Sequence, residues 1–167
     1  MALIDGMVQE LEDEARATRR VLERVPDKRL GWRPHEKART LGQLALHIAM
    51  VPGGVAQLVA SPSPARAPQF GPDPSPASSS ELVPALEQSV AKAKQLLGEM
   101  DDAALTSTWR LTNGDRELFA TSRAAMLRSI MLNHWYHHRG QLTVYLRELG
   151  VPIPSVYGPS ADENPFV

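Results

Sequence analysis

The chain has 167 residues, the length of one ordinary domain, and its 43% hydrophobic and 22% charged residues are typical of a folded globular protein. Lys plus Arg total 18 against 19 for Asp plus Glu, and this balance excludes the positive surface with which nucleic-acid-binding proteins neutralise phosphates. The absence of cysteine excludes disulfides, thiolate ligands and a cysteine nucleophile. Any metal ion must therefore be held by His, Asp or Glu.

Two features predict a cytoplasmic protein without a membrane span. The longest uncharged stretch, residues 41–65, is interrupted by Pro52, Gly53 and Gly54. The N-terminal region is acidic where a signal peptide needs basic and then apolar residues. We therefore expect no membrane partner, and a single domain over residues 1–167.

The first half of the chain predicts two helices. Apolar residues recur at spacings of three and four over residues 2–25, which indicates an amphipathic helix that Pro26 stops. After a short connection, Thr40 is a suitable N-cap for a second helix that begins at Leu41. The Pro-Gly-Gly sequence at 52–54 is expected to kink this helix or end it early.

A Pro- and Ser-rich connection, residues 61–80, separates these helices from the rest of the chain. Its composition makes regular helix or strand improbable, and its length suits a crossing from one end of a bundle to the other. Ser78 and Glu81 fit a capping box for a third helix that ends near Met100.

The last third predicts a small hairpin and a fourth helix. Asn113 and Gly114 lie between two short apolar segments, as in a tight hairpin turn. Thr121 or Ser122 can then cap a helix that runs almost to Gly150, a suitable C-terminal glycine. The predicted fold is therefore all-α, a four-helix bundle with long crossover connections.

The candidate metal ligands in this sequence are histidines. His134 and His138 are four residues apart, so a helix presents both imidazoles on one face, while His137 is rotated by roughly 100 degrees from His138. A catalytic divalent ion usually needs a third protein ligand, and His47, in the apolar run LGQLALHIAM, is the best candidate. A lone buried histidine is more often a core residue, but three on inner faces of two helices favour a metal site. His35 is interpreted as a surface or packing residue.

Four other polar residues near these positions have two interpretations each. Gln43 and Gln141 could orient ligands or make ordinary hydrogen bonds between helices. Arg139 and Arg147 could hold an anionic substrate or be surface or dimer-edge residues. No acid or base catalyst can be named, so the catalytic residues are unknown.

The sequence resembles the DinB/YfiT-like metal-dependent family over nearly the whole chain. Three segments carry the resemblance: VLERVPDKRLGWRPHEKARTLGQLALHIA, HWYHHRGQLTVYLRELGVPIP and VYGPSADENPF. The resemblance implies a four-helix bundle with long crossovers and a divalent-metal site at His47, His134 and His138. It also implies a homodimer, for which Trp135 and His137 on other faces of the last helix are candidate contacts.

The resemblance implies a metal-dependent enzyme that transfers a low-molecular-weight thiol to an electrophilic small molecule. Imidazole ligands suit zinc, nickel, iron and manganese, of which zinc or nickel is favoured. The absence of cysteine is consistent with a sulfur that a thiol cofactor supplies. A metal-dependent hydrolase, a non-enzymatic metal-binding stress protein and a plain dimerisation module with incidental histidines remain open alternatives.

Overall fold

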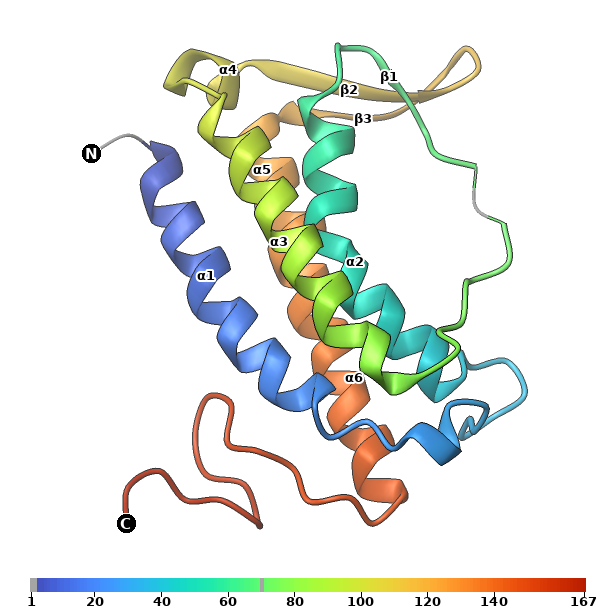
Figure 1. Ribbon diagram of the computed structural model, residues 1–167. Coiled ribbons are helices and arrows are strands. Elements are labelled where there is room, and N and C mark those ends of the chain that lie inside the picture. Colours follow the sequence, from blue (N-terminus) through green and yellow to red (C-terminus); the bar gives the residue numbers. More distant parts are fainter. Residues whose placement is uncertain (1–2, 70) are drawn as a thin grey trace.

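The computed structural model describes residues 3–69 and 71–167. Four long helical segments form a bundle, of which three are α1 (Leu3–Leu22), α2 (Leu41–Ala60) and α3 (Leu82–Gly98), and the fourth ends in α6 (His134–Glu148). Figure 1 shows that α2 and α3 run parallel to each other, whereas α1 and α6 run the opposite way. The predicted four-helix bundle is confirmed.

The helix α1 ends before Pro26, as predicted, and the 3-10 turn η1 (Asp27–Arg29) follows it. Its buried face is set by the helical period, and this face packs mainly against α3. Ala2, the predicted first residue of the helix, lies outside the described residues.

The helix α2 begins at its predicted cap. Thr40 Oγ1 accepts a hydrogen bond from the backbone N–H of Gln43 at 3.2 Å, and Gln43 Oε1 accepts one from the N–H of Thr40 at 2.9 Å. This reciprocal capping box satisfies two backbone donors that the first helical turn cannot pair. Gln43 is therefore part of the helix start, a role that the sequence analysis did not assign to it.

The predicted early end of α2 at residues 52–54 is wrong, because the helix continues to Ala60. Pro52 has no N–H for the carbonyl of Ile48, and Trp135 Nε1 donates to that carbonyl instead at 2.9 Å. The N–H of Gly53 donates to Ser89 Oγ at 2.8 Å, and a Cβ at Gly53 would lie 2.8 Å from the backbone oxygen of Ser89. Contacts from α6 and α3 thus allow the helix to pass through this sequence.

The connection 61–80 crosses the molecule from the sheet to the start of α3 (Figure 1). It is mostly irregular, but the prediction that it holds no strand is wrong. Ala65–Arg66 forms β1, which pairs in parallel with Leu111 and Thr112 of β2 (Thr108–Asn113). A free strand edge on β2 can pair with even two residues of a proline-rich segment.

The predicted capping box at Ser78 and Glu81 does not form. Ser78 Oγ accepts from the N–H of Ser80 at 3.2 Å and caps the short 3-10 turn η2 (Ser79–Glu81), after which α3 begins. The carboxylate of Asp27 accepts the N–H of Ser79 at 2.8 Å, which ties this turn to η1.

The predicted hairpin is present and covers one end of the bundle (Figure 1). After the short helix α4 (Asp102–Thr106), β2 pairs in antiparallel orientation with β3 (Arg116–Ser122). Gly114, with a positive φ of 60°, begins the two-residue turn, a conformation that glycine adopts without strain. Trp109 of β2 is fully buried and joins the sheet to the core.

The fourth helical segment has three parts. Ser122 Oγ accepts the N–H of Ala125 at 3.1 Å and caps α5 (Arg123–Met126). The next seven residues, η3 (Leu127–Asn133), are wound as a π-helix, and α6 begins immediately after them at His134. Gly150, with φ 70°, ends the segment as predicted. The π-helical turns place the histidines of α6 directly after a change in helical register.

One helix of the described chain, α2, is long and apolar enough to cross a membrane by length and composition. Half of its apolar window is buried within the protein, where it packs against α3 and α6. A core helix of a bundle meets the same criterion, so this finding carries no argument for a membrane.

Candidate metal centre

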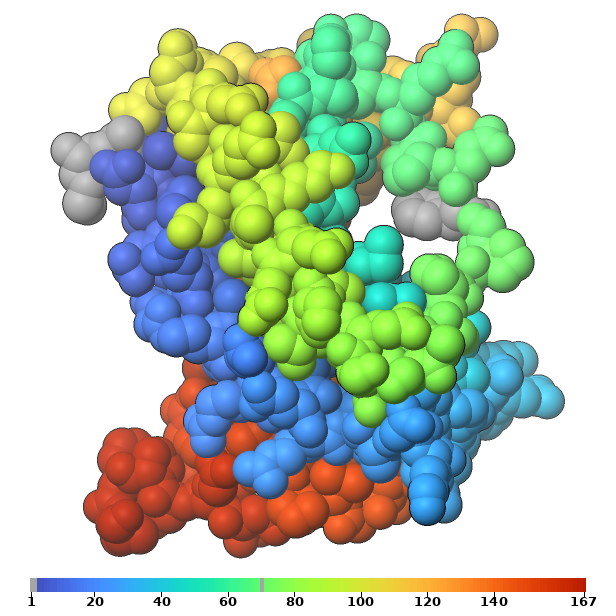
Figure 2. Space-filling view, viewed as in Figure 1, coloured from blue at the N-terminus to red at the C-terminus, as the bar shows by residue number. Residues whose placement is uncertain are grey.

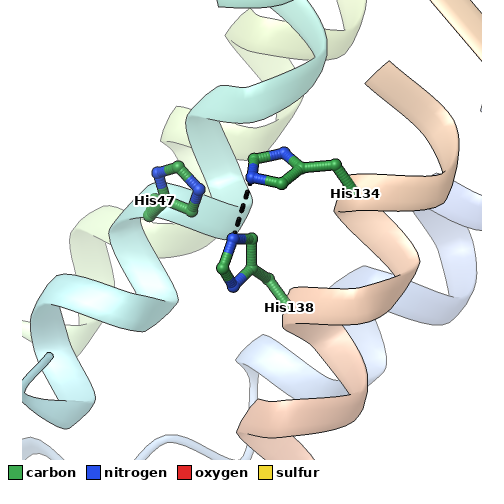
Figure 3. Close-up of side chains that lie close together, drawn as sticks. All are labelled: His47, His134 and His138. Atoms are coloured by element: carbon green, nitrogen blue, oxygen red, sulfur yellow. Dashed lines mark hydrogen bonds between the residues drawn. The ribbon is translucent and has the colours of Figure 1, made fainter. Parts of the chain in front are cut away.

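Three histidines from two helices meet inside the bundle (Figure 3). His47 comes from the first half of α2, and His134 and His138 lie one turn apart at the start of α6. One ring nitrogen from each residue lies within 4.8 Å of the other two. The Nε2 atoms of His134 and His138 are 2.9 Å apart, and the ring centroid of His47 is 4.6 Å from that of His138. The three predicted residues are thus brought together.

Burial lowers the pKa of all three imidazoles. Desolvation, followed by the charge of Arg39, lowers the pKa of His47 from 6.5 to about 4. Desolvation likewise lowers the pKa of His138 to about 4 and lowers that of His134. All three rings are therefore neutral at pH 7, and a neutral imidazole has the lone pair that a metal ligand needs.

The buried Nε2 of His47 has no hydrogen-bond partner among the described residues. Burying a polar atom without a partner costs about 1–3 kcal/mol. Because the Nε2 of His47 lies beside two further imidazoles, a cation at this point would satisfy it. The donor set of three imidazoles fits a divalent ion of the zinc or nickel type. The three-histidine group could therefore hold a metal ion.

Gln141 orients His138. Its Oε1 lies 2.7 Å from Nδ1 of His138. A carbonyl oxygen accepts and does not donate, so Nδ1 carries the ring proton and Nε2 keeps its lone pair towards the other histidines. Gln141 thus has the predicted orienting role, whereas Gln43 caps α2 and donates to the backbone oxygen of Asp73 at 3.2 Å.

A hydrogen bond next to two of the histidines holds α2 and α6 together. Trp135, fully buried and adjacent to His134, donates from Nε1 to the carbonyl of Ile48, the neighbour of His47. Trp135 was a candidate for an outer, dimer-forming face, and that prediction is wrong. The π-helical turns of η3 before α6 were not predicted, because the sequence pattern indicated one continuous helix.

An apolar cavity of about 640 Å³ opens beside the histidines. Its walls are mainly apolar side chains of α2, η3 and the connection 61–80, with His47 and His134 among the lining residues. The apolar lining residues are Met50, Val51, Val55, Leu58, Pro68 and Ile130. Figure 2 shows the molecule hollowed between α2 and the connection. A small molecule in this cavity would lie against the imidazole cluster.

Arg39 and Asp73 form an ion pair at the same cavity. Arg39, which lines it, donates from Nε and Nη2 to both carboxylate oxygens of Asp73, at 2.9 and 3.2 Å. These hydrogen bonds hold the pKa of Asp73 below its usual value. The pair fastens the connection to the start of α2. The sequence analysis missed both residues, since 34 positions separate them and no motif joins them.

The remaining candidate residues lie outside the cluster. His137 is exposed, as predicted, and His35 is an exposed loop residue. Arg147 is an exposed partner of Asp162. Arg139 is 2% exposed and bonded to Glu14 at 2.6 Å, so it is neither a surface arginine nor a free substrate-binding group.

The sequence matches the DinB family over residues 2–164. The chain belongs to the DinB family. It is similar to the uncharacterized protein YrdA of Bacillus subtilis, with 26% identity over 166 residues that cover 96% of this chain and 91% of the relative. The resemblance found in the sequence is therefore confirmed.

Solved DinB-like structures share the fold. A DinB-like protein from Bacillus cereus superposes with a TM-score of 0.73 at 24% identity, over 92% of this chain and 97% of the other. The DinB-like protein YjoA of Bacillus subtilis superposes with a TM-score of 0.67 at 19% identity, over 90% and 97%. At these identities the likeness shows a common helical fold, and the ligand roles of the three histidines stay a prediction.

Proposed function

We propose that this DinB-family protein is a metal-dependent enzyme that transfers a low-molecular-weight thiol to an electrophilic small molecule. His47, His134 and His138 are the proposed ligands of one divalent ion, with zinc or nickel favoured. The observation that carries the proposal is the three-imidazole cluster in the wall of an apolar cavity of about 640 Å³. Structural zinc sites are usually closed by four protein ligands, whereas three histidines beside a cavity leave room for an exogenous ligand.

The chain's own residues supply ligands, orientation and an apolar surrounding. Gln141 keeps Nε2 of His138 free of a proton, and the low pKa values keep the imidazoles neutral at pH 7. A bound divalent ion would lower the pKa of a coordinated thiol and so supply a thiolate nucleophile. The apolar walls limit water near the electrophile. In the overall reaction the sulfur–carbon bond forms, the leaving group departs with its bonding electrons, and the thiol proton passes to solvent.

A panel of small thiols and electrophiles tests the proposal. Purified protein is assayed after stripping with a chelator and after reloading with zinc or nickel, and its metal content is measured by mass spectrometry. Thiol conjugation that requires both the metal and the thiol supports the proposal. Metal-dependent ester hydrolysis without a thiol would instead identify a hydrolase. Failure of the protein to bind either metal would refute the site itself.

A non-enzymatic metal-binding protein is the second alternative that this panel distinguishes. In that case metal would bind, neither reaction would occur, and stripping would lower the melting temperature steeply. An open site on a bundle with its own core should lose only the binding free energy set by metal concentration and affinity.

We further propose that the protein acts on small molecules as a cytoplasmic homodimer, without a nucleic-acid or membrane partner. Exposed residues on α6, His137 and Val144, are seven positions apart and so share one face of the helix. Val144 is 60% exposed, and this face is the proposed contact between two copies.

A further inference from the structure

Arg139 is a buried charged residue that directly follows a proposed metal ligand, His138. It forms an ion pair with Glu14 of α1, with 2.6 Å between Nη2 and Oε2. The side chain of Arg139 is 3% exposed and that of Glu14 is 15% exposed. A buried ion pair adds little net stability, because the lost hydration of the two charges offsets their attraction. The directions of its hydrogen bonds are what distinguish this pair from an apolar contact at the same place.

The guanidinium of Arg139 is bonded to two other parts of the chain. Its Nη1 donates to the backbone oxygen of Glu14 at 3.2 Å and to Thr18 Oγ1 at 3.0 Å. Its Nη2 also donates to the hydroxyl of Tyr157, which in turn donates to Glu14 Oε2 at 2.9 Å. Because the nitrogens of a guanidinium have a fixed planar arrangement, these bonds orient Arg139 relative to α1 and to the segment that follows α6.

These bonds restrict the rotation of α6 about its own axis. Trp135 and Arg139 are four residues apart and so share one side of α6, where the first is bonded to α2 and the second to α1. A rotation of about 20 degrees moves an atom that lies about 5–6 Å from the helix axis by about 2 Å. Metal–ligand distances tolerate a deviation of only about 0.2 Å. A small rotation of α6 would therefore take its two histidines out of reach of an ion held by His47.

We propose that Arg139 is a positioning residue of the metal centre, which holds α6 in the rotation that directs both of its ligand histidines at His47. It acts from the side of α6 that contacts α1, through Glu14 and Tyr157. This inference rests on the proposed function for the metal site alone, and it holds for any reaction that the bound ion supports. The buried pair then contributes through the geometry that it imposes on α6.

An apolar replacement of the pair separates positioning from stability. The double variant Arg139→Met, Glu14→Leu removes both charges and keeps similar side-chain volumes, a change that is often neutral or stabilising for a buried ion pair. Thr18 Oγ1 can then donate to the backbone oxygen of Glu14, one turn earlier in the same helix. Tyr157 is exposed, so its hydroxyl can bond to water. The single variant Arg139→Met would instead leave a carboxylate buried without its partner.

Cobalt(II) is the probe, because the visible absorption of the bound ion changes with its coordination geometry. Its affinity for the chelator-stripped, full-length proteins is measured by competition with a chelator. We expect the double variant to bind cobalt more weakly by roughly tenfold or more and with an altered spectrum. The melting temperature of the metal-free double variant should equal or exceed that of the metal-free wild type.

The matched control is the double variant Arg19→Met, Glu87→Leu. It removes an ion pair between α1 and α3, in which Arg19 Nη1 lies 2.6 Å from Glu87 Oε1. Neither residue contacts α6 through this pair, so the control should bind cobalt with the affinity and the spectrum of the wild type.

The outcomes separate the inference from the proposed function. Wild-type affinity and spectrum in Arg139→Met, Glu14→Leu would overturn the inference, and so would a melting temperature that falls together with the affinity. Failure of the wild type to bind cobalt would overturn both the inference and the metal site. Cobalt binding that the double variant weakens, in a protein that conjugates no thiol, would refute the transferase proposal and retain the role of Arg139.

Discussion

His138 is the residue on which the proposed metal site depends most directly. It is the most buried of the three histidines, and Gln141 holds its ring in the tautomer of a ligand. His137 is the adjacent residue in the sequence, and its exposed ring lies against that of His138, with 5.1 Å between the centroids, but it is not part of the three-histidine group. The chain thus contains a matched pair of histidines, one inside the cluster and one outside it.

Replacing His138 by Ala should abolish stoichiometric metal binding, with an affinity loss of roughly a hundredfold or more, because two imidazoles hold a divalent ion weakly. Thiol conjugation should disappear with the metal. His137→Ala should keep both the metal and the activity. Metal content by mass spectrometry and affinity by competition with a chromophoric chelator check the prediction, and equal metal content in the two variants would contradict the ligand assignment.

At the scale of elements, the hydrogen bond from Trp135 to the Ile48 carbonyl fixes the distance between α2 and α6 next to two proposed ligands. Pro52 makes this bond possible, since it leaves the Ile48 carbonyl without its helical partner. We therefore expect Trp135 to position the ligands of the proposed metal site. Variants of Trp135 distinguish this role from ordinary stabilisation of the core when the free energy of unfolding and the metal affinity are measured separately.

Trp135→Phe should lower the free energy of unfolding of the metal-free protein by about 1–3 kcal/mol, because a buried carbonyl loses its donor. Adding Pro52→Ala supplies a backbone N–H to the same carbonyl and should restore part of that loss. Trp135→Phe should also lower metal affinity, because it removes the hydrogen bond that links α2 to α6. Metal affinity should remain low in the double variant, since that link is still absent. Denaturant unfolding and chelator competition measure the two quantities, and recovery of both together would show that Trp135 acts through stability alone.

A group of hydrogen bonds around Glu10 joins α1 to the fourth helical segment. Arg128 donates to both oxygens of Glu10, at 2.6 and 2.7 Å, and Tyr136 Oη donates to Oε1 at 2.8 Å. The hydrogen bond from Arg128 is the main cause that lowers the pKa of Glu10 below 4.5. A carboxyl whose pKa is lower in the folded state stabilises the fold above its unfolded pKa and loses this effect as the pH falls through the folded value.

Glu10→Gln should therefore be less stable than the wild type by about 1 kcal/mol at pH 7, a value discounted for the partial exposure of the pair. The difference should shrink as the pH falls below about 4 and nearly vanish when the wild-type carboxyl is protonated. The melting temperatures of the two metal-free proteins, measured from pH 7 to below about pH 4, check the predicted change in the stability difference. A difference that does not change with pH would contradict the assignment of the effect to the Glu10 charge.

At the scale of the whole molecule, the long crossover is what makes the cavity. The connection 61–80 must pass from the sheet to the far end of the bundle, because α2 and α3 run parallel (Figure 1). The Arg39–Asp73 pair holds it over α2, and Pro68 closes one wall. The same connection that the bundle topology requires thus encloses the space beside the histidines.

The proposed homodimer is tested at this scale as well. Light scattering should give the mass of a dimer at micromolar concentrations, and Val144→Glu should give a monomer because it places a carboxylate in each copy of the contact face. The melting temperature of dilute Val144→Glu should match that of dilute wild type, since Val144 is exposed in the single chain. A monomeric wild type at high micromolar concentration would contradict the proposal.

The sequence by itself determined the features that depend on local geometry. The i, i+4 spacing of His134 and His138 needs only a helix to bring the two rings together. Thr40, Ser122 and Gly150 mark helix ends through hydrogen bonds and backbone angles of their own turns. The family resemblance covered nearly the whole chain and agreed with the bundle that these local signals predicted.

The tertiary structure decided what depends on contacts between distant segments. The Pro-Gly-Gly sequence at 52–54 was expected to kink α2 or end it early, but the helix continues to Ala60. Trp135 donates to the Ile48 carbonyl and Ser89 Oγ accepts the Gly53 N–H, and both contacts are set by the packing of α6 and α3. No local pattern in the sequence predicts that Trp135 is buried or that Arg39 pairs with Asp73. Periodicity assigns a residue to a face of its own helix, whereas the partner of that face, and the cavity between two partners, exist only after the helices and the crossover have packed together.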